Sequence, residues 1–167
     1  MINRRRPDHV KSWAEFEFLP GVLEALAALH ASGRQVVVIT NQAAVGRGLL
    51  AEAGLMRIHR LMLETINAAG GLVAAVYACL HRPDAGCDCR KPRTELFRRA
   101  GTELGINLRG SVVVGDASSD IEAARALGCP SILIADTHPA PAGTVPTAPS
   151  LAAAVAMIPS LGQKVTC

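Results

Sequence analysis

The sequence predicts an α/β fold in which helices cover both faces of a parallel sheet. Apolar, β-branched residues fill all but the first position of the runs 35–39 and 111–114, and such runs alternate with segments of helical periodicity. Strands that are apolar on both faces are typical of parallel sheets. Half of the 167 residues are hydrophobic but only 3% are aromatic, so aliphatic side chains must build the core. This length suits one domain over residues 1–167.

Glycine and proline mark the ends of the predicted elements. Pro20 and Gly21 begin the first helix, Pro92 suits the start of another, and Gly128 ends a third that Ser118 or Ser119 can cap. The predicted elements, in chain order, are a helix 21–33, a strand 35–39, a helix 50–69, a strand 72–78, an irregular loop 79–91, a helix 92–105, a strand 111–114, a helix 120–127, a strand 131–135, and a Pro- and Ala-rich loop with a short helix over 137–167.

Polar residues follow two of the predicted strands directly. Thr40, Asn41 and Gln42 come after the first strand, and Asp116 comes after the strand 111–114. In open α/β sheets, ligands bind at the carboxyl ends of the strands. The sequence therefore predicts a ligand site at this edge of the sheet.

The loop 79–91 has the spacing of a metal site. Cys79 and His81 are separated by one residue, as are Cys87 and Cys89. Three sulfurs and one imidazole can surround zinc tetrahedrally, and the metal can replace a core that this loop lacks. Because four ligands leave no open position, we expect structural zinc. The alternative is a chance cluster of reduced thiols.

Two carboxylates and a lysine have the chemistry of phosphate handling. Asp116 and Asp120 flank a predicted strand-to-helix turn, and magnesium commonly binds one or two carboxylates together with substrate phosphate. Lys91 can pair with a phosphoryl group, and Thr40 can donate a hydrogen bond to it. Acidic residues also cap helices, and a single lysine is usually solvated, so each residue alone has a purely structural alternative.

Composition argues against several classes of protein. The formal net charge is +3, with one Trp and one Tyr, which disfavours nucleic-acid binding by base stacking. The chain has neither a signal-peptide pattern nor an apolar run of ~20 residues that could span a membrane. We expect a soluble, cytoplasmic monomer. The triplet Arg4-Arg5-Arg6 either attracts a phosphorylated ligand or is a solvated arm.

Taken together, these motifs resemble those of the haloacid dehalogenase (HAD) superfamily. Thr40 after its strand matches the second family motif, and Lys91 matches the third. Asp116 with Asp120 matches the fourth. More narrowly, the chain resembles the D-glycero-D-manno-heptose 1,7-bisphosphate phosphatase branch, which includes histidinol-phosphate phosphatases. That resemblance runs from Ile2 to about Ala135 and is carried by the segments 16–21, 39–42 and 89–92 and by the Cys/His loop 79–89.

The resemblance implies a Rossmann-like three-layer fold and a magnesium-dependent phosphatase acting on a small phosphorylated sugar. Thr40 and Lys91 would stabilise the transferred phosphoryl group, and Asn41, Gln42 and Arg90 would contact the substrate. Magnesium would bind Asp116, supported by Asp120. Zinc would be held by Cys79, His81, Cys87 and Cys89. The expected reaction removes the 7-phosphate of the heptose bisphosphate, and histidinol phosphate is the alternative substrate.

One family motif has no match in this sequence. The first motif, D-x-D-G, supplies the nucleophile and the general acid–base of the family reaction, and the family residues that follow it appear at Ile2 and Asn3. We therefore expect the central strand of the sheet to be absent and this chain alone to be inactive, and we hypothesise a misassigned start with the motif encoded upstream. A non-catalytic, zinc-containing homologue is the alternative of another class, and a zinc-ribbon nucleic-acid binder is disfavoured by the short ligand spacing.

Overall fold

The structure of the chain is a computed structural model. It describes residues 1–135 and 145–158. The part of the predicted Pro- and Ala-rich loop at 137–144, and the tail from residue 159 onward with Cys167, lie outside the described residues.

All of the pairings between full strands in the described part are parallel, as predicted, whereas an isolated bridge between Asn3 and Phe18 is antiparallel. Strand β1 (Val37–Asn41) pairs with β2 (Ala75–Cys79), with Thr40 opposite Ala78. Strand β3 (Val113–Gly115) pairs with β4 (Ser131–Ile134), which pairs with the short β5 (Thr147–Ala148). Hydrogen bonds thus divide the strands into a two-stranded and a three-stranded sheet.

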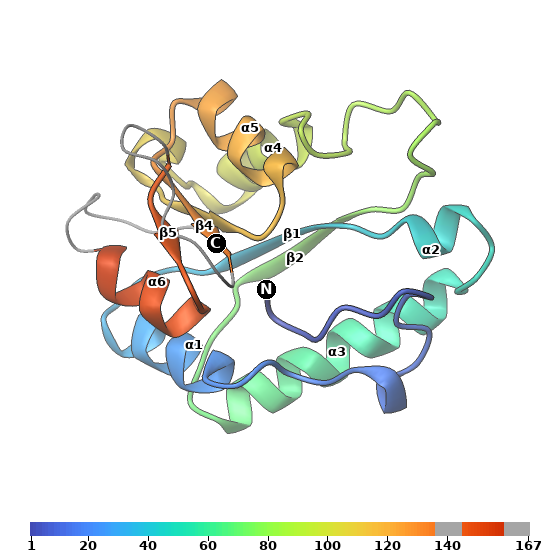
Figure 1. Cartoon of the computed structure of the whole chain (residues 1–167), viewed down its shortest axis with the longest axis horizontal. Helices are drawn as coiled ribbons and strands as arrows, with labels where there is room; N and C mark the ends of the chain where they lie inside the picture. The colour runs from blue at the N-terminus through green and yellow to red at the C-terminus, as the bar shows by residue number, and fades with distance from the viewer. Residues whose placement is uncertain (136–144, 159–167) are drawn as a thin grey trace.

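Helices cover both faces of the sheets, which confirms the three-layer α/β fold (Figure 1). On one face lie α1 (Val22–Ala31), α3 (Glu52–Ala68) and α6 (Leu151–Met157); on the other lie α4 (Glu95–Leu104) and α5 (Ser118–Leu127). The remaining elements are the short helix α2 (Ala43–Gly46) and the 3-10 turns η1 (Trp13–Glu15) and η2 (Leu108–Gly110). No helix in the described ranges has the length and apolar character needed to cross a bilayer.

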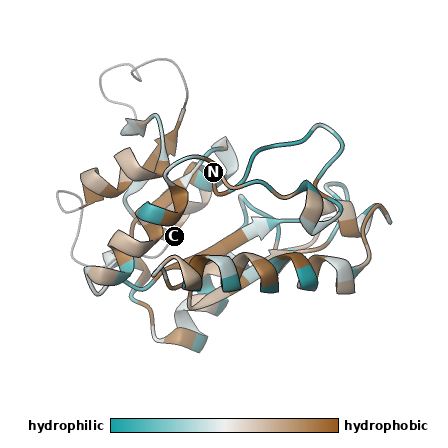
Figure 2. Cartoon of the chain, turned by 90° about the horizontal axis from the view of Figure 1, so that it is seen from below, coloured by the Kyte–Doolittle hydropathy of each residue, from teal (hydrophilic) through white to brown (hydrophobic). Residues whose placement is uncertain are grey.

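Strand β1 and the residue before it separate the core into two layers. Val36 belongs to the large cluster beneath α1 and α3, together with Leu26 and Ile66, whereas Val37 packs with Leu96 of α4 on the opposite face. Successive side chains of a strand point to opposite faces, so the run of valines fills both layers. Figure 2 shows the resulting pattern, with hydrophobic strands inside and helices that are hydrophobic on only part of their surface.

The edges of β1 and β3 that face one another are not hydrogen-bonded together. Val38 and Val114 belong to the same apolar cluster, and both border one cavity that lies between the two sheets. This division of the sheet agrees with the expectation that a central strand is absent between these two strands.

Several element boundaries differ from prediction. β1 extends through Thr40 and Asn41, because these residues continue the ladder with β2 instead of turning away from it. Helix α4 begins at Glu95 and not at Pro92. Residues 147–148, predicted as loop, form β5 along β4. Neither predicted serine caps α5; Ala117 occupies that position.

Candidate active site and candidate metal centre

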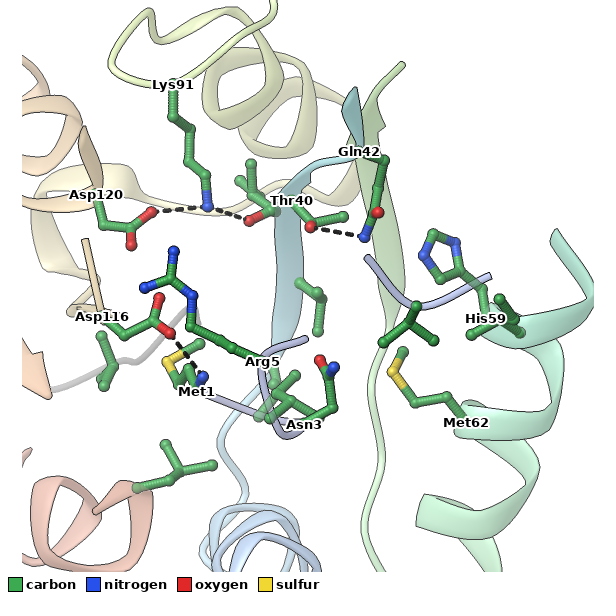
Figure 3. Close-up of a pocket in the computed structure, with 18 of the residues that line it drawn as sticks. Met1, Asn3, Arg5, Thr40, Gln42, His59, Met62, Lys91, Asp116 and Asp120 are labelled. Atoms are coloured by element: carbon green, nitrogen blue, oxygen red, sulfur yellow. Dashed lines mark hydrogen bonds and ion pairs between the residues drawn. The ribbon is translucent and has the colours of Figure 1, made fainter. Parts of the chain in front are cut away.

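A cavity of about 240 Å³ opens at the carboxyl ends of β1 and β3. Its polar lining comes from residues far apart in the sequence, which Figure 3 shows converging from separate elements. These polar residues are Asn3, Arg5, Thr40, Gln42, His59, Lys91, Asp116 and Asp120. The cavity therefore lies at the strand ends where the sequence predicts a ligand site.

Lys91 is held in the cavity wall from both its backbone and its side chain. The Asn41 side chain accepts from the Lys91 N–H at 3.1 Å and donates to its carbonyl at 3.2 Å. The Lys91 ammonium donates to the Ile39 carbonyl at 2.5 Å and pairs with Asp120 Oδ1 at 2.7 Å. Only 14% of the Lys91 side chain and 8% of the Asp120 side chain are exposed, so this ion pair is desolvated.

Thr40 presents its hydroxyl to the same cavity. Its oxygen accepts a hydrogen bond from Gln42 Nε2 at 3.1 Å, while the Gln42 backbone N–H donates to the Cys79 carbonyl at 2.7 Å. Because the hydroxyl accepts from Gln42, its own proton remains available to donate to a ligand oxygen.

Asp116 and Asp120 have different environments at the end of β3. Asp116 Oδ2 accepts from the Met1 ammonium at 2.8 Å. Burial tends to raise the pKa of Asp116, but the hydrogen bond and charge of that ammonium, with the charge of Arg5, lower it overall. Asp120 Oδ2 instead accepts from the Ala117 N–H at 3.1 Å. Asp116 is therefore ionised and pairs with the ammonium of Met1, whereas both oxygens of Asp120 have partners within the site.

Only a glycine at position 115 allows Asp120 to lie this close to the strand. A Cβ added at Gly115 would stand 2.2 Å from Asp120 Cβ and 2.5 Å from its Oδ2. Such distances lie far inside van der Waals contact, so a side chain here would displace the carboxylate from Lys91. The Gly-Asp pair at the end of β3 thus has a steric role as well as a chemical one.

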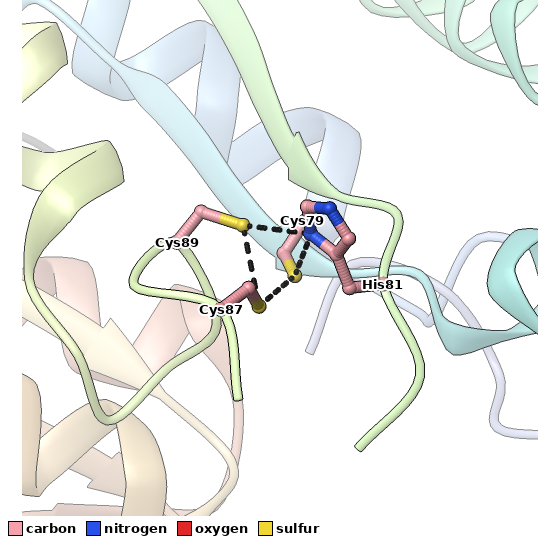
Figure 4. A group of neighbouring side chains, drawn as sticks. All are labelled: Cys79, His81, Cys87 and Cys89. Atoms are coloured by element: carbon pink, nitrogen blue, oxygen red, sulfur yellow. Dashed lines mark hydrogen bonds between the residues drawn. The ribbon is translucent and has the colours of Figure 1, made fainter. Parts of the chain in front are cut away.

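The four residues of the predicted zinc loop form one tight cluster (Figure 4). Their ligand atoms all lie within 4.8 Å of one another. Cys79 Sγ is 3.6 Å from Cys87 Sγ, which is 3.6 Å from Cys89 Sγ, and His81 Nδ1 is 3.8 Å from Cys79 Sγ and 3.2 Å from Cys89 Sγ. A tetrahedral zinc with bonds of ~2.3 Å to sulfur would hold two sulfurs about 3.8 Å apart, so the arrangement fits such an ion.

The raised pKa of one thiol in this cluster also shows that a positive charge would be stabilising there. Burial, together with the neighbouring Cys79 and Cys87, raises the pKa of Cys89 to about 12. Without a positive charge at the centre, Cys89 is therefore a neutral thiol, and a bound metal would expel its proton. Cys129 lies outside the cluster; it is buried, as predicted, and its thiol donates to the Leu108 carbonyl at 2.9 Å.

The structure brings most of the predicted site residues together. Asn41 and Arg90 do not line the cavity: Asn41 holds the Lys91 backbone, and Arg90 Nη1 is buried without a hydrogen-bond partner among the described residues. Their predicted contacts with substrate stay predictions.

Three lining residues, Asn3, Arg5 and His59, were not predicted as site residues. For Arg5 the sequence contains a signal, namely the positive charge of the triplet Arg4-Arg5-Arg6. In the structure Arg4 pairs with Glu17 and Arg6 with Asp8, while Arg5 reaches the cavity (Figure 3).

Comparison with known proteins identifies relatives of this chain. The family model described as HAD-hyrolase-like matches residues 88–154. The chain is 39% identical over 134 residues to the D-glycero-beta-D-manno-heptose-1,7-bisphosphate 7-phosphatase of Pseudomonas aeruginosa, covering 80% of this chain and 75% of the relative. It is 38% identical over 145 residues to the D-glycero-alpha-D-manno-heptose-1,7-bisphosphate 7-phosphatase of Mycobacterium tuberculosis, covering 80% and 74%.

A solved structure shows the same fold over nearly the whole chain. The crystal structure of the D,D-heptose 1,7-bisphosphate phosphatase from B. bronchiseptica, complexed with magnesium and phosphate, superposes with a TM-score of 0.86 at 34% identity, covering 95% of this chain and 93% of that one. A second solved structure, from Mesorhizobium loti and described as a putative HAD-like phosphatase, has a TM-score of 0.81 at 28% identity, covering 98% of this chain and 83% of that one.

The parallel sheets between helical layers and the relatives above place the chain in the class of HAD-like phosphatases. Within that class, the chain belongs to the family of D-glycero-D-manno-heptose-1,7-bisphosphate 7-phosphatases.

Proposed function

We propose that this protein removes the 7-phosphate of a D-glycero-D-manno-heptose 1,7-bisphosphate. The observation that carries the proposal is the convergence of Thr40, Lys91 and Asp116 on one cavity, joined with the family to which the chain belongs. A hydroxyl, an ammonium and a carboxylate suited to magnesium are together what a transferred phosphoryl group requires.

Each residue of the candidate site has a part in the proposed reaction. Lys91 offsets negative charge on the phosphoryl oxygens, and Asp120 and Asn41 position Lys91 through the contacts described above. Thr40 donates a hydrogen bond from its hydroxyl group to a phosphoryl oxygen. Asp116 would hold magnesium, which would supply further neutralisation of phosphate charge. Gln42 hydrogen-bonds Thr40, and Asn41, Gln42 and Arg90 are the proposed substrate contacts.

The nucleophile comes from the D-x-D-G motif that the family resemblance implies. A carboxylate oxygen of its first aspartate attacks phosphorus, the bond to the sugar oxygen breaks, and the second aspartate gives the leaving oxygen a proton. Water then hydrolyses the aspartyl-phosphate, which releases inorganic phosphate. Because residues 1–167 contain no such motif, we propose that the protein is active when this segment precedes Ile2 and inactive as given.

We further propose that zinc occupies the Cys/His cluster and has a structural role. Lys91 follows the last thiol ligand by two residues, and Arg93 donates to the carbonyl oxygens of Gly86 and Cys87 within the loop. A metal that fixes this loop would therefore also fix the backbone from which Lys91 extends. A single-domain, cytoplasmic monomer stays a prediction; size-exclusion chromatography with light scattering tests the oligomeric state.

The test is turnover by the chain extended at its N-terminus with a strand that ends in Asp-x-Asp-Gly. Phosphate release from both anomers of the heptose bisphosphate is compared with release from histidinol phosphate. We expect the heptose ester to be preferred and Lys91→Met to lower kcat by ~10²–10³, whereas Arg60→Met, on the outer face of α3, leaves kcat unchanged. If histidinol phosphate is turned over faster than the heptose bisphosphate, histidinol phosphate becomes the proposed substrate. A folded, extended chain without phosphatase activity would support the non-catalytic alternative.

A further inference from the structure

Helix α3 turns one polar residue toward the cavity in an otherwise apolar stripe. Leu55, Ile58, Met62 and Ile66 are buried and recur at the spacing of one helical face. His59 lies on the same side and lines the cavity together with Leu55, Ile58 and Met62. A leucine or methionine would continue this stripe, so packing alone does not require an imidazole here.

His59 has no hydrogen-bonding or ionic partner among the described residues, although it is partly buried. Burial lowers its pKa below the ordinary value, so the imidazole is neutral at neutral pH. A buried polar group without a partner destabilises a protein by roughly 1–3 kcal/mol unless water or a ligand satisfies it. The open cavity in front of the ring gives access to such a partner.

The position of His59 separates it from the groups that handle phosphate. Figure 3 shows its ring on the α3 wall near Gln42, across the cavity from the side where Asp116 and Asp120 lie. Lys91 and Thr40 lie between these two walls. A ligand with its phosphate at Lys91 and its remaining atoms inside the cavity can therefore extend toward His59.

We propose that His59 is a specificity-determining residue that hydrogen-bonds a hydroxyl group of the sugar part of the substrate. This assignment rests on the proposed function, because that function places the phosphate at Lys91. A neutral imidazole has one donor and one acceptor nitrogen, and a hydroxyl group likewise donates and accepts. The apolar neighbours of His59 leave few competing partners, and they would disfavour a second charged group at this wall.

The test measures binding to the 167-residue chain by isothermal titration calorimetry in the presence of magnesium. The probes are orthophosphate, which reports the phosphate site, and heptose 1,7-bisphosphate, which adds the sugar hydroxyls. His59→Leu removes both hydrogen-bonding nitrogens and continues the apolar stripe, while His59→Gln keeps a neutral donor and acceptor. The matched control is His30→Leu, at an exposed position near the end of α1.

We expect His59→Leu to weaken binding of the heptose bisphosphate about tenfold, which is ~1.4 kcal/mol, and to leave the orthophosphate Kd within about twofold. His59→Gln should recover most of the loss, and His30→Leu should change neither Kd. The role of His59 would be overturned if a His59→Leu variant with the wild-type circular dichroism spectrum changed the Kd of both probes equally or changed neither. Either result would leave the proposed function intact. A wild-type chain that binds neither probe would overturn the role of His59, and phosphate release by the N-terminally extended chain would then decide the proposed function separately.

Discussion

Replacing Lys91 by methionine tests whether the ion pair at the centre of the site is desolvated. Methionine keeps much of the side-chain length and removes the charge, so Asp120 loses the partner that stands at 2.7 Å. Removing one member of a buried ion pair costs ~3–5 kcal/mol. Because 14% of the Lys91 side chain is exposed, we expect the lower end, about 3 kcal/mol, out of a total stability of ~5–15 kcal/mol.

The assay is urea unfolding followed by circular dichroism and by fluorescence of the single tryptophan, Trp13. Arg60→Met is the matched control: Arg60 pairs with Glu64 at 2.8 Å, but both side chains are more than half exposed, so its loss should cost at most ~0.5 kcal/mol. The double variant Lys91→Met/Asp120→Asn should regain most of the stability, since no uncompensated carboxylate remains. A Lys91→Met variant within 1 kcal/mol of wild type would refute the reasoning.

Three further predictions concern the strand end, the thiol cluster and the partly buried His59. Gly115→Ala should destabilise the fold by roughly 1–3 kcal/mol because the new methyl group collides with Asp120; urea unfolding measures it, and a loss below 0.5 kcal/mol would contradict the close approach. Zinc added to the metal-free chain at pH 7.5 should release protons, since Cys89 is a neutral thiol there; calorimetry in buffers of different ionisation enthalpy counts them, and Cys89→Ser should release fewer. The folded chain should lose stability as the pH falls through about 6.5, the unfolded histidine pKa, because burial lowers the His59 pKa and only the unfolded chain readily takes the proton. His59→Leu should reduce the stability difference between pH 7.5 and pH 5.5, and an unchanged difference would assign the effect to other groups.

The sequence predicted the fold class, and it predicted which residues meet at the cavity and in the thiol cluster, because the signals for them are local. A run of valines such as residues 36–38 indicates a strand buried on both faces. The spacing of Cys79 and His81 is typical of metal ligands and can be recognised from neighbouring residues alone. Strand ends in a parallel sheet lie on one edge, so the meeting of Thr40 with Asp116 followed from topology. These parts required only periodicity and the geometry of parallel strands.

Other features depended on contacts that no local pattern contains. The substrate contact of Asn41 stays a prediction, whereas the two hydrogen bonds between its amide and the backbone of Lys91, fifty residues away in sequence, had no signal in the sequence. His59 was hidden within a helix whose apolar spacing predicts only packing. The short strand β5 has two residues, too few for a periodic signal, and it forms because β4 offers an open edge to residues 147–148.

A crystal structure of the 167-residue chain grown with magnesium and orthophosphate tests the central claim most directly. We predict phosphate oxygens at hydrogen-bonding distance, about 3 Å, from both Thr40 Oγ1 and Lys91 Nζ, with the cation on Asp116. Phosphate held elsewhere, for example by Arg4 and Arg6 at the surface, with the cavity filled only by water, would contradict the assignment of this cavity as the phosphate site.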